Sequence, residues 1–400
     1  MHAPAVDPLM IDRALEGVAS RMVAFRRDIH AHGELAWHEV RTSAAVADEL
    51  RRSGLEPSLL ASGTGLVCEV AGTRDGPRVA LRADLDALPI NDEKDVAYRS
   101  TTPGVAHACG HDVHTAVVLG AGTALARLAA DGQLPGRVRL LFQPAEEVVP
   151  GGALSMLAAG ALEGVERVFA LHCDPRVEAG SVAVRDGPIT AATDAVTVRL
   201  SGPGGHTARP QLSVDVVAAL ADVVTRTPLL LSRRVDPRAG MSLVWGRIAA
   251  GSATNVIPQS GEAAGTVRTL DQATWKASEA LLSEIIRQVA APYGAQVQID
   301  YAQGVPPAVN DPDATSAFRV AAAAVLGPGA VLDATQSMGA EDFAWMLEQV
   351  PGVLARLGVR RPGTLEAPDL HRGDFDVDEM AIASGTRVLL AVTLDALAGG

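Results

Sequence analysis

A repeating pattern in the first half of the chain is the feature that most constrains its fold. Apolar runs of strand length, rich in β-branched residues, occur at 78–82, 137–142 and 167–171, and each is followed by polar residues. Between the first two runs, residues 112–130 have the length and apolar spacing of a helix. Strands that alternate with helices predict a mostly parallel α/β sheet, because parallel strands need a crossover connection.

The polar residues that follow these strands are acids and a histidine. The first run is followed by Asp84 and Asp86, the second by Glu146 and Glu147, and the third by His172. In open α/β sheets, ligand sites lie beyond the carboxyl ends of the strands. We therefore expect these side chains to converge, although they are far apart in the sequence.

The pattern changes near residue 187. Strand-like and helix-like segments then follow in the order strand, helix, two strands, helix and strand, at 193–202, 213–234, 241–251, 260–270, 274–294 and 295–304. This β-α-β-β-α-β order is typical of a ferredoxin-like domain. We expect a smaller domain, 187–303, inserted between two parts of the α/β domain, 1–186 and 304–400. Further helices are expected at 12–29, 40–53, 313–326 and 377–398.

Composition excludes several classes of function. A net charge of −13 and an aromatic content of 3% argue against a nucleic-acid partner. The N-terminal stretch carries acids and no apolar signal-peptide core, and the longest apolar runs, such as 116–126, predict no membrane span because they are too short to cross a bilayer. Three scattered cysteines form no disulfide framework, so we expect a cytoplasmic protein.

The stretch HACGHDVHT, residues 107–115, concentrates histidine and cysteine in a chain that has only ten His and three Cys. Cys109 and His111 flank a turn before the helix and can reach one small region, and their side chains suit Zn²⁺ and similar ions. In the pair at 146–147, one carboxylate can bind metal while the other acts as a general base. His172 and His371 could be further ligands.

Other interpretations of these residues stay open at this point. An isolated cysteine is more often a buried small residue, a pair of glutamates is usually solvated, and a lone histidine is usually on the surface or satisfied in the core. The spacing Cys-x-His is by itself a weak motif. A cysteine hydrolase that uses Cys109 and a nearby histidine is the rival catalytic hypothesis.

Taken together, the motifs resemble a known family. They occur in the expected order from residue 21 to about 397: HACGHDVHTAVVLG, FQPAEE, the LH at 171–172, GPGGHTARP, NVIP, GTVRT, GAEDF and the LH at 370–371. The chain is similar to the aminoacylase/carboxypeptidase family of metallopeptidases, in the amidohydrolase branch that includes hippurate hydrolases and N-acyl-amino-acid deacylases. The resemblance implies a catalytic domain with two metal ions and a satellite domain that commonly dimerises.

The resemblance also implies roles for individual residues. The metal ligands would be Cys109, His111, Glu147, His172 and His371. Cys109 would bridge two divalent ions, which could be Zn, Mn, Co or Ni because the ligand set suits several of them. Glu146 would be the general base that deprotonates the attacking water and then protonates the leaving amine.

Three residues of the smaller domain would contact the substrate. His206 would stabilise the tetrahedral oxyanion, often from the partner subunit, and Asn255 and Arg268 would bind the substrate carboxylate, for which arginine has matching geometry. Without the resemblance, His206 and Asn255 read as turn residues and Arg268 as a solvated strand residue.

Asp84 matches an acid that occurs across the wider family, where a histidine two residues earlier is a metal ligand. Arg82 stands at that earlier position, as in the amidohydrolase branch, so we expect Asp84 to support the ligands from behind or to cap the following loop. We expect His107 and His114 to be structural or supporting residues, and Cys173 to be buried packing.

The predicted function is therefore a metal-dependent amidohydrolase that acts on small N-acyl or aryl-acyl amino acids, as a homodimer without a nucleic-acid or membrane partner. Gln211 and Gln259 depart from the family pattern on the substrate side, so no particular substrate is implied. The alternatives are a metallo-dipeptidase or carboxypeptidase on the same fold, the Cys109-dependent hydrolase, and a metal-free binding protein.

Overall fold

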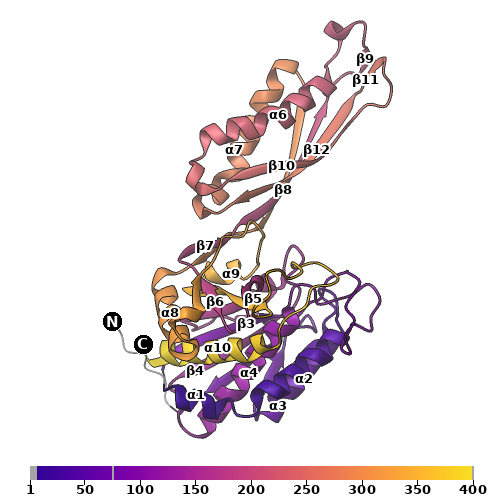
Figure 1. Cartoon of the computed structure of the whole chain (residues 1–400). Coiled ribbons are helices and arrows are strands. Elements are labelled where there is room, and N and C mark those ends of the chain that lie inside the picture. Colours follow the sequence, from indigo (N-terminus) through magenta and orange to yellow (C-terminus); the bar gives the residue numbers. More distant parts are fainter. Residues whose placement is uncertain (1–6, 74–75, 399–400) are drawn as a thin grey trace. The chain divides into compact units, whose positions relative to one another are not determined.

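The computed structural model describes residues 7–73 and 76–398. The chain divides into two compact units, which are described separately (Figure 1). The first unit contains the described residues up to Gly187, together with Val309–Thr335 and the described residues from Trp345 onward. The second unit contains Pro188–Ala308 and Gln336–Ala344. The assignment of a catalytic domain and an inserted satellite domain stays a prediction at this point.

An eight-stranded sheet forms the centre of the first unit. Its strands, in spatial order, are β1 (Pro57–Leu59), β2 (Leu66–Ala71), β4 (Arg137–Gln143), β3 (Arg78–Asp84), β5 (Arg167–Glu178), β16 (Gly352–Arg360), β6 (Val182–Val184) and β15 (Val331–Asp333). The neighbouring strands β4, β3, β5 and β16 are parallel. Strands β3 and β16 are buried along almost their whole length, which explains their continuous apolar sequence.

The sheet is mixed, whereas the sequence pattern predicted a mostly parallel one. Antiparallel pairs join β1 to β2, β2 to β4, and β16 to β6, while β6 and β15 are parallel. Strands β1 and β2 are linked by a short connection, which permits only an antiparallel hairpin. The prediction therefore holds for the central strands that carry the polar residues and for the edge pair β6 and β15, and it fails for the three antiparallel pairs.

Helices cover this sheet: α1 (Pro8–Ala14), α2 (Val18–Ala31), α3 (Val40–Arg52), α4 (His111–Ala130), α5 (Gly152–Ala158), α8 (Pro312–Leu326), α9 (Ala344–Leu347) and α10 (Met380–Ala398). Helix α4 packs against α2, α10 and β3, as Figure 1 shows, and most of its residues are buried. The single helix expected at 12–29 is two helices, because Gly17 has a left-handed backbone (φ 72°) at the start of α2.

Two helices of the first unit, α4 and α10, are long and apolar enough to cross a membrane by length and composition. The expectation that no apolar segment has spanning length is therefore too strict. In both helices 78% of the apolar window is buried inside the protein. Their apolar character is explained by their place in the core.

The second unit contains a four-stranded antiparallel sheet in the order β10 (Ser242–Ala250), β12 (Ser260–Thr269), β8 (Ala192–Ser201) and β13 (Gln296–Val305). Helices α6 (Val216–Arg234) and α7 (Gln272–Ala290) share its apolar core. Residues in β8 alternate between buried and more exposed positions, which is the period expected of a strand with one covered face.

Short elements complete the two units. A second ladder of the second unit pairs β9 (Gly205–His206) with β11 (Val256–Ile257). Strands β7 (Gly187–Thr190) and β14 (Ala308–Asn310) lie where the chain passes between the units, and short 3-10 turns occur at 210–212, 237–239, 291–293 and 328–330.

Candidate metal centre

The turn before α4 presents Cys109 and His111 on either side of Gly110. Gly110 has a left-handed backbone (φ 86°), and a Cβ at this position would lie 2.7 Å from Cys173 Sγ. Only glycine fits both the backbone conformation and the space. This close packing fixes the turn and directs both neighbouring side chains into the same region, beside His172 of β5.

His111 is held so that one ring nitrogen is available to bind a metal. Its Nδ1 lies 2.9 Å from the carbonyl oxygen and 3.2 Å from the Oδ1 of Asp86, and both of these atoms are acceptors. Nδ1 therefore carries the proton. The buried Nε2 has no hydrogen-bond partner among the described residues, so its lone pair is unused.

His172 is oriented in a similar way. Its Nδ1 donates to the carbonyl oxygen of Cys173 at 2.8 Å, which leaves Nε2 as the unprotonated nitrogen. That Nε2 lies 3.5 Å from Cys109 Sγ. The residue belongs to β5, so the sheet itself places the histidine beside the turn that carries the cysteine.

The loop after β4 contributes the two glutamates. The Glu147 backbone N–H donates to Asp86 Oδ2 at 2.9 Å. The buried Oε1 of Glu147 lies 3.7 Å from His111 Nε2 and 3.4 Å from His371 Nε2, and it has no hydrogen-bond partner in the described part of the chain. The carboxylate therefore points into the same space as the two histidines.

His371 approaches the cluster from the chain's C-terminal part. Its backbone is left-handed (φ 63°), and its N–H donates to the carbonyl oxygen of Ala108 at 2.7 Å. Its Nε2 lies 3.3 Å from Cys109 Sγ. The imidazole is 52% exposed, whereas Cys109 is buried, so this side of the cluster opens to solvent.

The structure thus brings together all five side chains predicted as ligands, with Glu146. Their ligand atoms form three overlapping groups, each within 4.8 Å: Cys109, His111 and His172; Cys109, Glu147 and His371; and His111, Glu146 and Glu147. Sulfur, imidazole nitrogen and carboxylate oxygen together suit Zn²⁺ and similar divalent ions. The unused His111 Nε2 and Glu147 Oε1 show that these residues fit a bound cation.

The local charges also favour a cation. Burial opposes protonation of His111, but Asp84, Cys109 and Asp86 together outweigh it and raise the pKa of His111 well above its usual value. Burial raises the pKa of the Cys109 thiol, and burial and His114 lower that of His172. A divalent ion would replace the proton of Cys109 and the second proton of His111, whereas His172 already offers an unprotonated Nε2, because metal binding requires the deprotonated ligands.

Asp84 is buried beside the cluster, and its role stays a prediction. Its Oδ1 accepts from His114 Nδ1 at 2.7 Å, and its Oδ2 accepts from Arg82 Nη1 at 2.7 Å. His114 Nε2 in turn accepts the N–H of Cys173 at 2.8 Å, which assigns the His114 proton to Nδ1. A looser group of Asp84, His111 and His114 also lies within 4.8 Å. Cys173 is fully buried, and its role as packing stays a prediction.

Asp86 is the supporting residue that the sequence reasoning left without a role. It contacts the ligand residue His111 and also accepts the Glu147 N–H. Burial opposes its ionisation, but the hydrogen bond with His111, the charge of His111 and the backbone N–H groups of Glu146 and Glu147 together outweigh this and lower the pKa of Asp86. Its position two residues beyond Asp84, after the end of β3, was the available signal.

His107 is not among the clustered ligand groups, and the three predicted substrate residues belong to the second unit. His107 is buried, burial lowers its pKa to about 4, and neither ring nitrogen has a hydrogen-bond partner among the described residues. His206 lies exposed in β9, and its Nδ1 accepts the Ala208 N–H at 3.0 Å. The Asn255 carbonyl accepts the N–H of Thr207, and Arg268 donates to the Met338 carbonyl. These three belong to the second unit, and their roles stay predictions.

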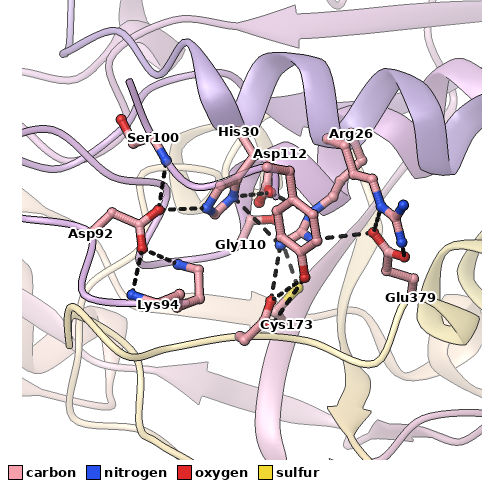
Figure 2. Close-up of polar contacts among 12 residues, drawn as sticks. Arg26, His30, Asp92, Lys94, Ser100, Gly110, Asp112, Cys173 and Glu379 are labelled. Atoms are coloured by element: carbon pink, nitrogen blue, oxygen red, sulfur yellow. Dashed lines mark hydrogen bonds and ion pairs between the residues drawn. The ribbon is translucent and has the colours of Figure 1, made fainter. Parts of the chain in front are cut away.

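A second buried polar cluster begins at Asp112, the residue after His111 (Figure 2). Asp112 Oδ2 accepts from Arg26 Nε at 2.6 Å and from His30 Nδ1 at 2.7 Å. The other His30 nitrogen lies 3.1 Å from Asp92 Oδ2, and Asp92 Oδ1 lies 2.9 Å from Lys94 Nζ. Two acids thus alternate with three basic groups inside the first unit. We call these five residues the ionic network.

Comparisons with known proteins agree with this geometry. The pattern of peptidase family M20/M25/M40 matches residues 80–395. N-acetylcysteine deacetylase of Bacillus subtilis is 36% identical over 377 residues, which cover 93% of this chain and 95% of that protein. A Rhodococcus jostii protein named as a glutamate–cysteine ligase is 49% identical over 373 residues; these cover 93% of this chain but 46% of that protein.

Solved structures show the same fold. A Bacillus subtilis protein described as a dinuclear metal-binding peptidase superposes with a TM-score of 0.84 at 31% identity, over 96% of this chain and 99% of that one. The match to the family covers more than half of the sequence and includes the turn, the loop and the strands that carry the cluster. The chain therefore belongs to the M20/M25/M40 family of peptidases, and it is an enzyme of this hydrolase family.

Proposed function

We propose that this hydrolase is a metal-dependent amidohydrolase that cleaves N-acyl or aryl-acyl amino acids to a carboxylate and a free amino acid. The observation that carries the proposal is the cluster of five ligand side chains with Glu146 beside them. A relative named for the deacetylation of N-acetylcysteine supports an amide substrate of this kind.

Two divalent ions fit the cluster better than one. The groups Cys109, His111, His172 and Cys109, Glu147, His371 share only the cysteine, so its thiolate could serve two neighbouring ions. When bound, such ions supply Lewis-acid polarisation of the amide carbonyl and a more acidic water. The donor set suits Zn²⁺, Mn²⁺, Co²⁺ and Ni²⁺ alike.

Glu146 is proposed as the general base. Its carboxylate lies in one group with His111 and Glu147, and Glu147 is anchored through its backbone to Asp86. Glu146 would take a proton from the attacking water and deliver it to the amine that leaves, which makes one side chain the base and then the acid.

The second unit is proposed as an inserted, ferredoxin-like satellite domain. Its element order β8-α6-β10-β12-α7-β13 and its strand order β10-β12-β8-β13 support this. A substrate role for His206, Asn255 and Arg268, a homodimer formed through this unit and a cytoplasmic location remain parts of the same proposal.

A peptidase on the same fold is the second candidate, because a solved relative is described as one. A dipeptide differs from an N-acyl amino acid by its free amine, which needs an acidic partner in the site. Hydrolysis rates for glycyl-leucine and for its N-acetylated analogue would separate the two functions, since an amidohydrolase prefers the acylated compound.

The Cys109-dependent hydrolase is disfavoured by the environment of the thiol. Burial raises the pKa of Cys109, whereas a nucleophilic cysteine needs a lowered one. A metal enzyme loses activity with a chelator and regains it with a divalent ion. A cysteine enzyme would resist the chelator and be inactivated by alkylation.

The direct test of the proposal is a panel of N-acetyl, N-benzoyl and longer N-acyl amino acids with the wild type and Glu146→Gln. We expect turnover by the wild type and a loss of about a thousandfold in the variant, with its metal content unchanged. Near-normal activity of Glu146→Gln would overturn the assignment of the base.

A further inference from the structure

The loop that carries the two glutamates has a strained backbone directly before them. Ala145 adopts a left-handed conformation (φ 52°), which costs a residue with a Cβ about 1 kcal/mol. Such a conformation persists only where surrounding contacts hold it. The contacts that hold Ala145 therefore also decide where Glu146 and Glu147 point.

Three hydrogen bonds hold this loop, two of them from distant parts of the first unit. Glu39 Oε1 accepts the N–H of Ala145 at 2.7 Å, and Asp86 Oδ2 accepts the N–H of Glu147 at 2.9 Å. The carbonyl of Ala145 accepts the N–H of Gly152 at 2.9 Å. The backbone is thus fixed on both sides of Glu146.

Glu39 is an unusual residue to find in this place. It occupies the N-cap position of α3, yet its side chain makes no capping hydrogen bond to that helix. It is fully buried, and its Oε2 has no hydrogen-bond partner among the described residues. Burial raises the pKa of Glu39, and hydrogen bonds from backbone N–H groups, including that of Ala145, only partly offset this. A buried carboxyl group with one oxygen lacking a hydrogen-bond partner lowers the stability of the fold.

The cap of α3 comes instead from Glu34. Its Oε1 accepts the N–H of Arg41 at 3.0 Å, and its Oε2 accepts the N–H and hydroxyl of Thr42 at 2.8 and 2.9 Å. The two glutamates at the start of α3 therefore have separate contacts: Glu34 binds the helix, and Glu39 binds the loop after β4.

We propose that Glu39 is a positioning residue of the active site, which holds the left-handed turn at Ala145 and so directs Glu146 and Glu147. This inference rests on the proposed function and extends it to a residue outside the cluster. Support of this kind around a metal ligand or a base commonly changes metal affinity or activity by about 10–100-fold.

The test compares variants of the full-length enzyme by kcat, KM and the Kd for Zn²⁺ from competition with a chromophoric chelator. Glu39→Met keeps the volume and removes the acceptor, so we expect kcat to fall and the Kd for Zn²⁺ to rise by about tenfold each, with KM nearly unchanged. Glu39→Gln keeps an acceptor oxygen for Ala145 and should stay within about threefold of the wild type. Glu39→Ala repeats the test if the Met variant does not fold.

Two further variants separate positioning from general stability. Ala145→Gly lowers the cost of the left-handed turn, and should recover part of the kcat lost in Glu39→Met. Glu34→Ala is the matched control: it removes the cap of α3, so it should lower Tm but leave kcat and the Kd for Zn²⁺ within about twofold.

The inference would be overturned if Glu39→Met had the same kcat and the same Kd for Zn²⁺ as the wild type. It would also be overturned if Glu34→Ala lost as much kcat and Zn²⁺ affinity as Glu39→Met. If the wild type hydrolysed no N-acyl amino acid, the proposed function would fail. The Kd for Zn²⁺ in Glu39→Met would still show whether Glu39 positions the metal ligands. The two failures are therefore distinguishable.

Discussion

Two buried polar clusters meet at consecutive residues of α4, and they are built in opposite ways. The metal cluster, reached through His111, leaves His111 Nε2 and Glu147 Oε1 without hydrogen-bond partners in the described part of the chain. The ionic network, reached through Asp112, pairs each acid with basic groups on two sides (Figure 2), although Asp112 Oδ1 has no hydrogen-bond partner among the described residues.

The difference shows what each cluster is for. A buried polar atom without a partner costs about 1–3 kcal/mol, so a cluster that leaves such atoms aimed at one another is suited to an external cation. A network whose charges compensate one another needs no ligand and instead fixes the helix end. The ionic network thus holds the end of α4 in place, so that His111 can keep an unpartnered nitrogen in the metal cluster.

The largest effect is expected from a change in the metal cluster. Glu147→Gln keeps the shape but removes the charge, so metal affinity should fall by about a hundredfold or more. The metal-free protein should unfold at nearly the same denaturant concentration, because Oε1 makes no hydrogen bond there. Chelator competition measures the metal affinity, and urea titration measures the stability of the metal-free protein. A large loss of stability in metal-free Glu147→Gln would contradict the proposed difference between the metal cluster and the ionic network.

Asp112→Ala, in contrast to Glu147→Gln, should strongly destabilise the metal-free protein. Arg26 and His30 would be left buried without their shared carboxylate, which should cost about 3–5 kcal/mol in the free energy of unfolding. Asp376→Ala is the control, since its partly exposed carboxylate lies 3.5 Å from Arg26 and should contribute less than about 1 kcal/mol. Equal effects of the two substitutions in urea titrations would show that burial of the network is unimportant.

Substitution of Asp92 should have a smaller effect on the free energy of unfolding, and this effect should depend on pH. Burial opposes its ionisation, but hydrogen bonds with His30, Ser100 and Lys94 outweigh this and hold the pKa of Asp92 below its usual value. A carboxyl with a depressed pKa contributes stability above its unfolded pKa of about 3.9, and loses it as pH falls through the folded pKa.

Asp92→Asn should therefore cost about 2 kcal/mol near neutral pH, and the difference from the wild type should shrink below about pH 4. Urea titrations of both proteins across this range measure it. A difference that is constant with pH would mean that the charge of Asp92 contributes nothing.

The smallest effect is expected at the rim of the network. Arg27 donates two hydrogen bonds to Glu379, but the guanidinium is 51% exposed. Arg27→Ala should therefore lower the free energy of unfolding by less than about 1 kcal/mol. A loss as large as that of Asp112→Ala would remove the distinction between the core and the rim of the network.

The sequence predicted the members of the metal cluster well, for a physical reason. The strand-end rule predicted that Glu147 and His172 converge, and both lie in the cluster, although β5 continues past His172 to Glu178; the family motifs supplied His371 from far along the chain. Parallel pairing of β4, β3 and β5 is what makes the rule work here. Their roles as ligands still await the experiments above.

Supporting residues could not be predicted in this way. In the sequence Glu39 only precedes the helix expected at 40–53, and the hydrogen bond that it accepts from the Ala145 N–H depends on a left-handed turn 106 residues away. Asp86 was noted at a strand end, but its contacts depend on the rotation of His111. The break at Gly17 and the antiparallel edges of the sheet likewise depend on local backbone conformation and tertiary packing.

The central claim, that the incompletely bonded cluster is a metal centre, is tested most directly by elemental analysis of the purified, desalted protein beside Cys109→Ser. We expect about two divalent ions per chain in the wild type and fewer in the variant, because the two ligand groups share this thiol. No bound metal in the wild type, even after incubation with Zn²⁺ or Mn²⁺, would contradict the claim and return Cys109 to the role of a nucleophile or of simple packing.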